Sequence, residues 1–213
     1  MYEFRVKDYD INISIVNKKD NMPLFVLNSY EREIEKIKNL VSDKSLVLVE
    51  VSGINWNSDM TPWKYNEFSG NADNYLNILI GEVMPKVNKY LKENSVNVVN
   101  YSLIGYSLAG LFSLYVSTKN TMFNYFASVS GSLWYKGFKE YFKKYKFNNK
   151  RFYISLGDKE SDTKNKTLKT VKDNTLEIVK YLEDNVYFEF NNGGHFKDEI
   201  IRISKAIDYL TVE

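Results

Sequence analysis

The sequence has no cysteine and only one histidine, His195, among its 213 residues. Without cysteine the chain can form neither disulfides nor thiolate metal sites, and it has no thiol nucleophile. A single imidazole argues against a metal centre built from several histidines. We therefore expect a protein that needs no metal and no other cofactor. The same imidazole is the only ready general base that the chain offers near neutral pH.

Excess charge of one sign, proline and long apolar runs are also scarce. The formal net charge is +2, and only three prolines occur. So small a charge does not indicate a nucleic-acid-binding protein. No apolar run approaches the length of a membrane span, and the first residues lack the apolar segment of a signal peptide. The sequence thus predicts a cytoplasmic protein with no nucleic-acid partner and no membrane partner.

One basic cluster interrupts the otherwise even distribution of charge. It comprises Lys136, Lys139, Lys143, Lys144, Lys146, Lys150 and Arg151. We interpret it as the solvated face of a connecting helix and loop. The alternative is a surface that attracts an anionic substrate.

Short apolar runs alternate with segments of helical periodicity along the chain. We predict strands at residues 2–7, 11–16, 24–27, 46–51, 96–104, 125–129, 152–156 and 186–190. Helices are predicted at residues 31–41, 73–92, 108–117, 167–182 and 196–210. The first two strands should form an antiparallel hairpin around residues 8–10. Pro85 falls inside the second helix and should kink it or split it in two.

This alternation predicts a single α/β domain over residues 1–213. Its central sheet should be mostly parallel, with helices on both faces and the N-terminal antiparallel hairpin at one edge. Ligands of such sheets bind at the carboxyl ends of the strands. Ser107, the loop after Leu156 and His195 each follow a predicted strand. We therefore expect all three at the same edge of the sheet.

Ser107 lies in a glycine-flanked turn, Gly-Tyr-Ser-Leu-Ala-Gly at residues 105–110. A predicted strand precedes it and a predicted helix follows, as in the sharp turns that expose a nucleophilic serine. Small residues are needed two positions before and two positions after such a serine, and Gly105 and Ala109 meet that demand. The five-residue pattern alone is weak, because an ordinary strand-to-helix turn with a capping serine also fits it.

His195 follows two glycines after the last predicted strand, which favours a catalytic role over a structural one. The chain order is then serine, acid, histidine. Three carboxylates compete for the acid in the loop after residues 152–156. Glu160 is favoured by its reach past Gly157, whereas Asp158 could instead form the turn and Asp162 could cap the following segment.

These segments resemble the putative-esterase branch of the α/β-hydrolases, which includes esterase D-like and siderophore esterases. The matching segments are residues 80–87, 104–115, 128–135, 156–160 and 193–196. The resemblance covers most of the chain from about residue 20 on, and it does not specify a substrate. It implies the α/β-hydrolase fold, and the chain is short enough to leave little sequence for a cap domain.

The resemblance also implies roles for individual residues. Ser107 is then the nucleophile, His195 the general base and Glu160 the acid that orients the imidazole, with Asp158 as the alternative acid. These roles describe a triad that forms an acyl-enzyme on the serine.

An oxyanion hole is implied as well. Its donors should be the backbone N–H of Leu108 and that of Ser29 or Tyr30. Family members often carry His-Gly or Asp-Gly after the first central strand, whereas this chain carries Asn28 and Ser29 there. The second donor matters, because losing one typically costs about 3 kcal/mol of barrier.

Aromatic residues are candidates for substrate binding. Tyr106 stands before the nucleophile, where relatives often have a histidine. Trp56, Trp63 and Trp134 lie in loops at the same sheet edge, and Trp134 is the first choice among them. Tryptophans also commonly pack loops onto the body of a protein. An aromatic pocket would favour an apolar or aromatic acyl or alcohol group.

The sequence therefore favours a serine ester hydrolase that acts on a small-molecule ester. Acyl transfer to an alcohol by the same residues is an alternative, because the two reactions differ only in the group that reaches the acyl-enzyme. A non-catalytic binding protein on the same scaffold is a third reading, and the retained serine, histidine and acid argue against it. A homodimer is considered as the quaternary state.

Overall fold

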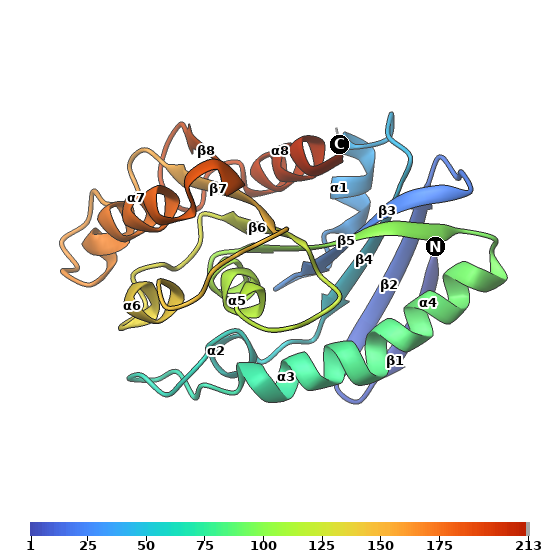
Figure 1. Ribbon diagram of the computed structural model, residues 1–213, viewed down its shortest axis with the longest axis horizontal. Coiled ribbons are helices and arrows are strands. Elements are labelled where there is room, and N and C mark those ends of the chain that lie inside the picture. Colours follow the sequence, from blue (N-terminus) through green and yellow to red (C-terminus); the bar gives the residue numbers. More distant parts are fainter. Residues whose placement is uncertain (212–213) are drawn as a thin grey trace.

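The computed structural model describes residues 1–211 and contains one eight-stranded sheet flanked by helices (Figure 1). The strands are β1 (Tyr2–Val6), β2 (Tyr9–Val16), β3 (Asn21–Asn28), β4 (Leu46–Ser52), β5 (Asn97–Tyr106), β6 (Tyr125–Val129), β7 (Arg151–Gly157) and β8 (Val186–Asn191). The α-helices are α1 (Ile34–Leu40), α2 (Trp56–Asp59), α3 (Ala72–Ile78), α4 (Met84–Glu93), α5 (Leu108–Ser117), α6 (Phe138–Phe142), α7 (Val171–Leu182) and α8 (Glu199–Thr211).

The strand order is β1-β2-β4-β3-β5-β6-β7-β8. β2 pairs antiparallel with both β1 and β4, and the remaining five pairings are all parallel. The mostly parallel sheet with an N-terminal antiparallel edge is thus confirmed. Because the parallel strands share one direction, β5, β7 and β8 deliver their following loops to the same edge.

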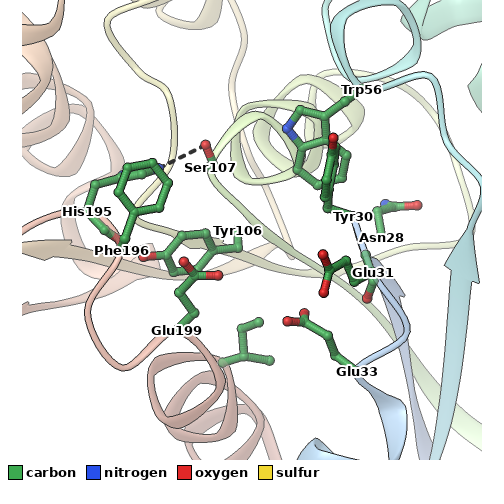
Figure 2. Close-up of a pocket in the computed structure, with 12 residues that line it drawn as sticks. Asn28, Tyr30, Glu31, Glu33, Trp56, Tyr106, Ser107, His195, Phe196 and Glu199 are labelled. Carbon is green, nitrogen blue, oxygen red and sulfur yellow. Dashed lines mark hydrogen bonds between the residues drawn. The ribbon is translucent and has the colours of Figure 1, made fainter.

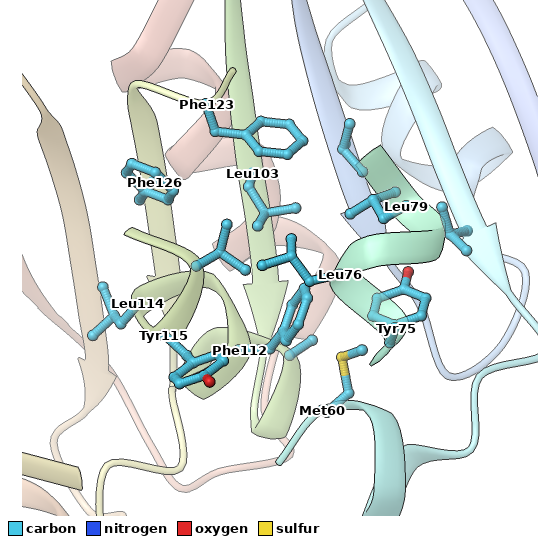
Figure 3. Close-up of a cluster of buried hydrophobic side chains, with 14 of the residues drawn as sticks. Met60, Tyr75, Leu76, Leu79, Leu103, Phe112, Leu114, Tyr115, Phe123 and Phe126 are labelled. Atoms are coloured by element: carbon cyan, nitrogen blue, oxygen red, sulfur yellow. The ribbon is translucent and has the colours of Figure 1, made fainter. Parts of the chain in front are cut away.

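The central strands of the sheet are buried on both faces, as their largely apolar sequences predict. In β3, Leu24 and Val26 belong to one core cluster, and Phe25 and Leu27 belong to the other. Helices α1 and α8 cover the second cluster, while α3, α4, α5, α6 and α7 lie over the first (Figure 1). Figure 3 shows part of the first cluster, where Phe112 of α5 packs beside Tyr75 of α3. This packing fixes α5, and with it the turn that carries Ser107.

Pro85 divides the long helix that the sequence predicts over residues 73–92. A π-helical turn (Leu79–Val83) separates α3 from α4, and the N–H of Met84 donates to the carbonyl of Leu79, five residues earlier. Proline has no N–H to continue the α-helical ladder, and a widened turn accommodates that loss. The predicted split is therefore confirmed, and the π-helical turn joins the two α-helices without an intervening loop.

Other local predictions need correction. The hairpin turn lies at Lys7 and Asp8 rather than at residues 8–10, because Tyr9 already pairs with Val6. Lys7 adopts a positive φ of 54°, which lets the chain reverse this tightly. The short helix α2 was not predicted. The closing helix begins at Glu199, three residues later than predicted, because residues 196–198 form the loop after His195.

The long connection between β6 and β7 contains little regular structure. Residues 130–150, between β6 and β7, hold only the five-residue helix α6, so no large cap domain covers the sheet edge in residues 1–211. Within the same residues, none of the helices combines the length and the apolar character that a bilayer span requires.

Candidate active site

Ser107 lies in a strained turn between β5 and α5. Its backbone angles are φ 58° and ψ −122°, a conformation that residues with a side chain rarely adopt and that costs about 1–3 kcal/mol. Four backbone hydrogen bonds hold the turn: the N–H of Ser107 donates to Val129, and the N–H groups of Gly110, Leu111 and Ser132 donate to the Ser107 carbonyl. The strain is thus imposed by the surrounding strands and helix, and it holds the hydroxyl at the sheet edge.

Gly105 permits this turn because β5 and α5 nearly touch there. A Cβ built on Gly105 would overlap the backbone carbonyl of Ala109, so no other residue fits without movement of the helix. Ala109 keeps its methyl group beside that glycine. The sequence requirement for small residues around Ser107 therefore has a direct steric cause.

His195 reaches Ser107 from the loop after β8. Its Nε2 lies 3.0 Å from Ser107 Oγ, and its Nδ1 lies 2.8 Å from Glu160 Oε2 (Figure 2 shows the serine contact). The imidazole is 26% exposed, whereas the Glu160 side chain is 3% exposed. Serine, histidine and a buried carboxylate therefore form one hydrogen-bonded line.

Glu160 is held as a carboxylate by its surroundings. Burial alone would raise the pKa of this carboxyl, but hydrogen bonds from His195 and from the N–H of Gly157 hold it below its ordinary value. The second oxygen, Oε1, accepts from Gly157 at 2.6 Å and from Arg202 at 3.2 Å. Glu160 thus carries a negative charge at neutral pH, as the hydrogen bond that it accepts from the imidazole requires.

Arg202 organises this corner of the site, although it does not contact Ser107. Its guanidinium is 1% exposed and donates to Glu160, to Ser130 Oγ at 2.8 Å, and to the carbonyls of Asn192 and Gly194 at 3.3 and 3.0 Å. One buried side chain therefore ties the acid to the loop that carries His195.

The competing carboxylates lie elsewhere. Asp158 Oδ1 accepts from the N–H of Gly193 at 2.7 Å, so it braces the glycine turn before His195 and does not contact the imidazole. Asp162 is exposed. Of the three carboxylates weighed from the sequence, only Glu160 is placed against His195.

The two proposed second donors of the oxyanion hole differ in availability. The N–H of Ser29 donates to the carbonyl of Val51 at 3.0 Å, and this contact removes Ser29 as a donor. Leu108 is the first residue of α5, where a backbone N–H has no partner within its own helix. The N–H groups of Leu108 and Tyr30 therefore remain as the candidate pair.

Two cavities meet at Ser107 and His195. The first, of about 410 Å³, is bounded by the segment after β3, by Trp56 and Tyr106, and by the start of α8. The second, of about 240 Å³, is bounded by Ser132, Trp134, Leu168 and Val171. An ester has an acyl part and an alcohol part. Two cavities that meet at the serine can therefore hold one part each.

The aromatic candidates separate into two groups. Trp134 lines the second cavity, and Tyr106 lines the first while its hydroxyl donates to the His195 carbonyl. Trp63 instead packs on Tyr135 and Phe138, donates to the carbonyl of Lys136, and lines neither cavity. The expectation that Trp63 contacts substrate is not supported by this position, because the indole fastens one loop to another.

Several residues at the site escaped the sequence analysis, namely Asn28, Glu31, Glu33, Phe196, Glu199 and Arg202. Of these residues, only Arg202 could have been singled out from the sequence. It lies on the buried face of α8 with Ile203, Ala206 and Ile207, where a charged residue needs a buried partner.

The comparisons with known proteins agree with this architecture. A family model described as "Putative esterase" matches residues 35–199. A comparison with curated proteins finds no match.

Several solved structures share the fold. The siderophore hydrolase EstB from Aspergillus nidulans superposes with a TM-score of 0.82 at 17% identity, covering 99% of this chain and 93% of its own. An IroE-like serine hydrolase from Shewanella oneidensis superposes with a TM-score of 0.79 at 16% identity. The match covers 95% of this chain and 75% of that protein's chain. The enterobactin and salmochelin hydrolase IroE superposes with a TM-score of 0.76 at 21% identity. The match covers 100% of this chain and 94% of the IroE chain. With the family model matching most of its length, the chain belongs to the "Putative esterase" family and is an ester hydrolase of the α/β-hydrolase fold.

Proposed function

We propose that this esterase works through an acyl-enzyme on Ser107, with His195 as general base and Glu160 as the orienting acid. The observation that carries the proposal is the continuous contact from Ser107 Oγ to His195 Nε2, and from His195 Nδ1 to Glu160 Oε2. In this arrangement Glu160 accepts a hydrogen bond from the Nδ1–H group of His195, which leaves Nε2 unprotonated and able to take the serine proton.

The reaction proceeds in two halves. Ser107 Oγ attacks the ester carbonyl while its proton moves to His195 Nε2, and the carbonyl oxygen becomes an oxyanion facing the N–H groups of Leu108 and Tyr30. The tetrahedral intermediate collapses, and His195 gives the proton to the departing alcohol. Water then attacks the acyl carbonyl while giving a proton to His195, and His195 returns that proton to Ser107 Oγ as the bond between Ser107 and the acyl group breaks and the acid departs.

The substrate is a small-molecule ester whose two parts occupy the two cavities. Two of the three similar structures described above are named for siderophore or enterobactin hydrolysis, so siderophore lactones belong in the substrate panel. The cytoplasmic location and the homodimer remain predictions from the sequence.

Rapid mixing with p-nitrophenyl esters of two to eight carbons tests the mechanism. Formation of an acyl-enzyme predicts an initial burst of one p-nitrophenol per protein molecule whenever deacylation is slower than acylation. Adding an alcohol such as 1-propanol separates hydrolysis from acyl transfer, because an acyltransferase would form the propyl ester as its main product. Absence of turnover on every ester, with the protein folded, would contradict the proposal.

The N–H of Tyr30 gives a separate prediction. Tyr30→Pro removes this N–H, and the loss of one oxyanion donor is expected to lower kcat by about 10²- to 10³-fold. Tyr30→Ala keeps the N–H and removes only the ring, so its larger effect should be on KM. Steady-state kinetics of both variants, with melting temperatures to show that both are folded, makes the comparison. Equal kcat values for the two variants would exclude Tyr30 as the second donor.

A further inference from the structure

Of the two cavities at Ser107, the first has an acidic wall. We name this cavity the acidic pocket; its carboxylates are those of Glu31, Glu33 and Glu199 (Figure 2). Neither Lys nor Arg is among the described residues that line it. The second cavity contains one carboxylate, Glu160, which is already committed to His195 and Arg202. The charge around the nucleophile is therefore strongly one-sided.

Nearby cations do not neutralise this wall. Arg32 is drawn away to Asp10 at 3.3 Å, and Arg202 is buried against Glu160. Burial raises the pKa of Glu33, and the charge of Glu199 raises it further, whereas Lys36 acts in the opposite direction. Two carboxylates from distant parts of the chain thus face one another with little compensation.

The position of Glu33 is fixed by a buried carboxylate beneath it. Glu50 is fully buried in β4, and its Oε1 accepts from the N–H groups of Glu33 and Ile34 at 2.6 and 3.0 Å. Asn12 donates to the other oxygen of Glu50 at 3.3 Å. The start of α1 is therefore anchored to the sheet, and Glu33 belongs to a rigid wall rather than to a mobile loop.

Aromatic rings accompany the carboxylates. Tyr30 and Phe196 are 73% and 85% exposed, although both rings line the acidic pocket. Trp56 lies edge-on to Tyr30, with ring centroids 5.6 Å apart. Aromatic faces attract cations through their quadrupole, and carboxylates attract them through charge. A pocket that combines both is complementary to an ammonium or guanidinium group.

The wall of the acidic pocket also contains a buried amide, that of Asn28. Asn28 is 5% exposed; its Oδ1 accepts from the Tyr75 hydroxyl, but its Nδ2 has no partner among the described residues. Asn28 lines the acidic pocket, and Figure 2 shows it beside Tyr30 and Glu31. Because Nδ2 is itself shielded from solvent, Asn28 forms part of the wall and is not assigned as a contact for a bound molecule.

We propose that the acidic pocket selects esters that carry a positive charge on the part of the substrate that lies beside Glu33 and Glu199. The proposal rests on the function proposed above and adds the substrate class. The basic cluster does not oppose it: Lys139 and Lys143 pair with Glu177 of α7 at 2.8 and 2.7 Å and line neither cavity. An anionic ester would instead meet three carboxylates on its way to Ser107.

Two series of matched esters test the proposal without assuming which part of the ester enters the acidic pocket. In the acyl series, p-nitrophenyl 4-(trimethylammonio)butyrate is compared with p-nitrophenyl 5,5-dimethylhexanoate and p-nitrophenyl glutarate. In the alcohol series, butyrylcholine is compared with its neutral isostere 3,3-dimethylbutyl butyrate. We expect the cationic ester to exceed its neutral partner at least tenfold in kcat/KM in one series, and the glutarate ester to be the poorest of its series.

The double variant Glu33→Gln/Glu199→Gln should bring the cationic preference to within about threefold of unity, because it removes charge while keeping shape. The readout is the ratio of kcat/KM for the cationic ester to that for its neutral partner, so a general loss of turnover in the variant does not affect it. The matched control is Glu93→Gln. It changes an exposed carboxylate of α4 that does not line the acidic pocket, so it should keep the full preference for the cationic ester.

Each outcome separates this inference from the function on which it rests. Turnover of neutral esters with no cationic preference in either series would overturn the inference and leave the esterase mechanism standing. A preference that survives in the double variant would also overturn it, because Glu33 and Glu199 would not be its cause. No turnover of any ester by the folded protein would remove both.

Discussion

Replacing Ser107 with alanine is expected to lower kcat for p-nitrophenyl butyrate by about 10⁴- to 10⁶-fold, the range found when a triad nucleophile is removed. His195→Ala should cause a loss of similar size, because no second imidazole exists in the chain to take the serine proton. The double variant should lose hardly more than either single variant, because the two residues act as one unit.

Ser102→Ala is the matched control for these variants. Ser102 lies on β5 and is fully buried, and its hydroxyl has no partner among the described residues, so its removal should leave turnover close to wild type. Circular dichroism would show that all the variants are folded. Turnover within tenfold of wild type in Ser107→Ala would place the nucleophile elsewhere.

Arg202→Met should have the largest effect on stability. Removing one partner of a buried ion pair leaves the other charge without compensation, which costs about 3–5 kcal/mol. Glu160 would be that stranded charge, since its side chain is 3% exposed. Urea unfolding at pH 7 measures the loss. Arg5→Met, at an exposed arginine, is the control and should change the free energy of unfolding by less than about 0.5 kcal/mol.

The same variant should also lower kcat more than KM. Arg202 contacts Glu160 and the carbonyls of the loop before His195, but it does not line either cavity. Its loss would misplace the base without removing a contact to substrate. An Arg202→Met protein as stable as Arg5→Met, with unchanged kcat, would show that this network does not position the triad.

The pKa of Glu160 fixes the pH at which these measurements apply. Because the folded protein holds this pKa below its ordinary value, the ionised carboxylate stabilises the fold at neutral pH. That contribution is present above the ordinary pKa of the unfolded chain, and it is lost as the pH falls through the lower pKa of the folded state. Stability comparisons between wild type and Arg202→Met therefore belong at pH 7.

The sequence predicted those parts of the molecule that depend on local patterns. The parallel sheet follows from apolar runs alternating with helical periodicity, and the strained turn at Ser107 follows from the small residues at 105 and 109. Glu160 was favoured over Asp158 only because it lies further past Gly157 in the loop. The structure places Glu160 against His195. These features need only a few neighbouring residues to be recognisable.

The remaining features depend on contacts between distant segments. Nothing near Ser29 in the sequence shows that its N–H is taken by Val51, because that contact is set by the pairing of β3 with β4. Glu33 and Glu199 come to one cavity only when α1 and α8 pack on the same face of the sheet. Likewise, Trp63 is drawn to Lys136, far along the chain, by loop packing.

The most direct test of the account is covalent labelling of Ser107 by a fluorophosphonate, followed by intact-mass measurement and peptide mapping. The account predicts a single adduct, located on Ser107, which is absent in Ser107→Ala and forms far more slowly in His195→Ala. An adduct on any other residue, or ester hydrolysis by a protein whose Ser107 stays unlabelled, would contradict it.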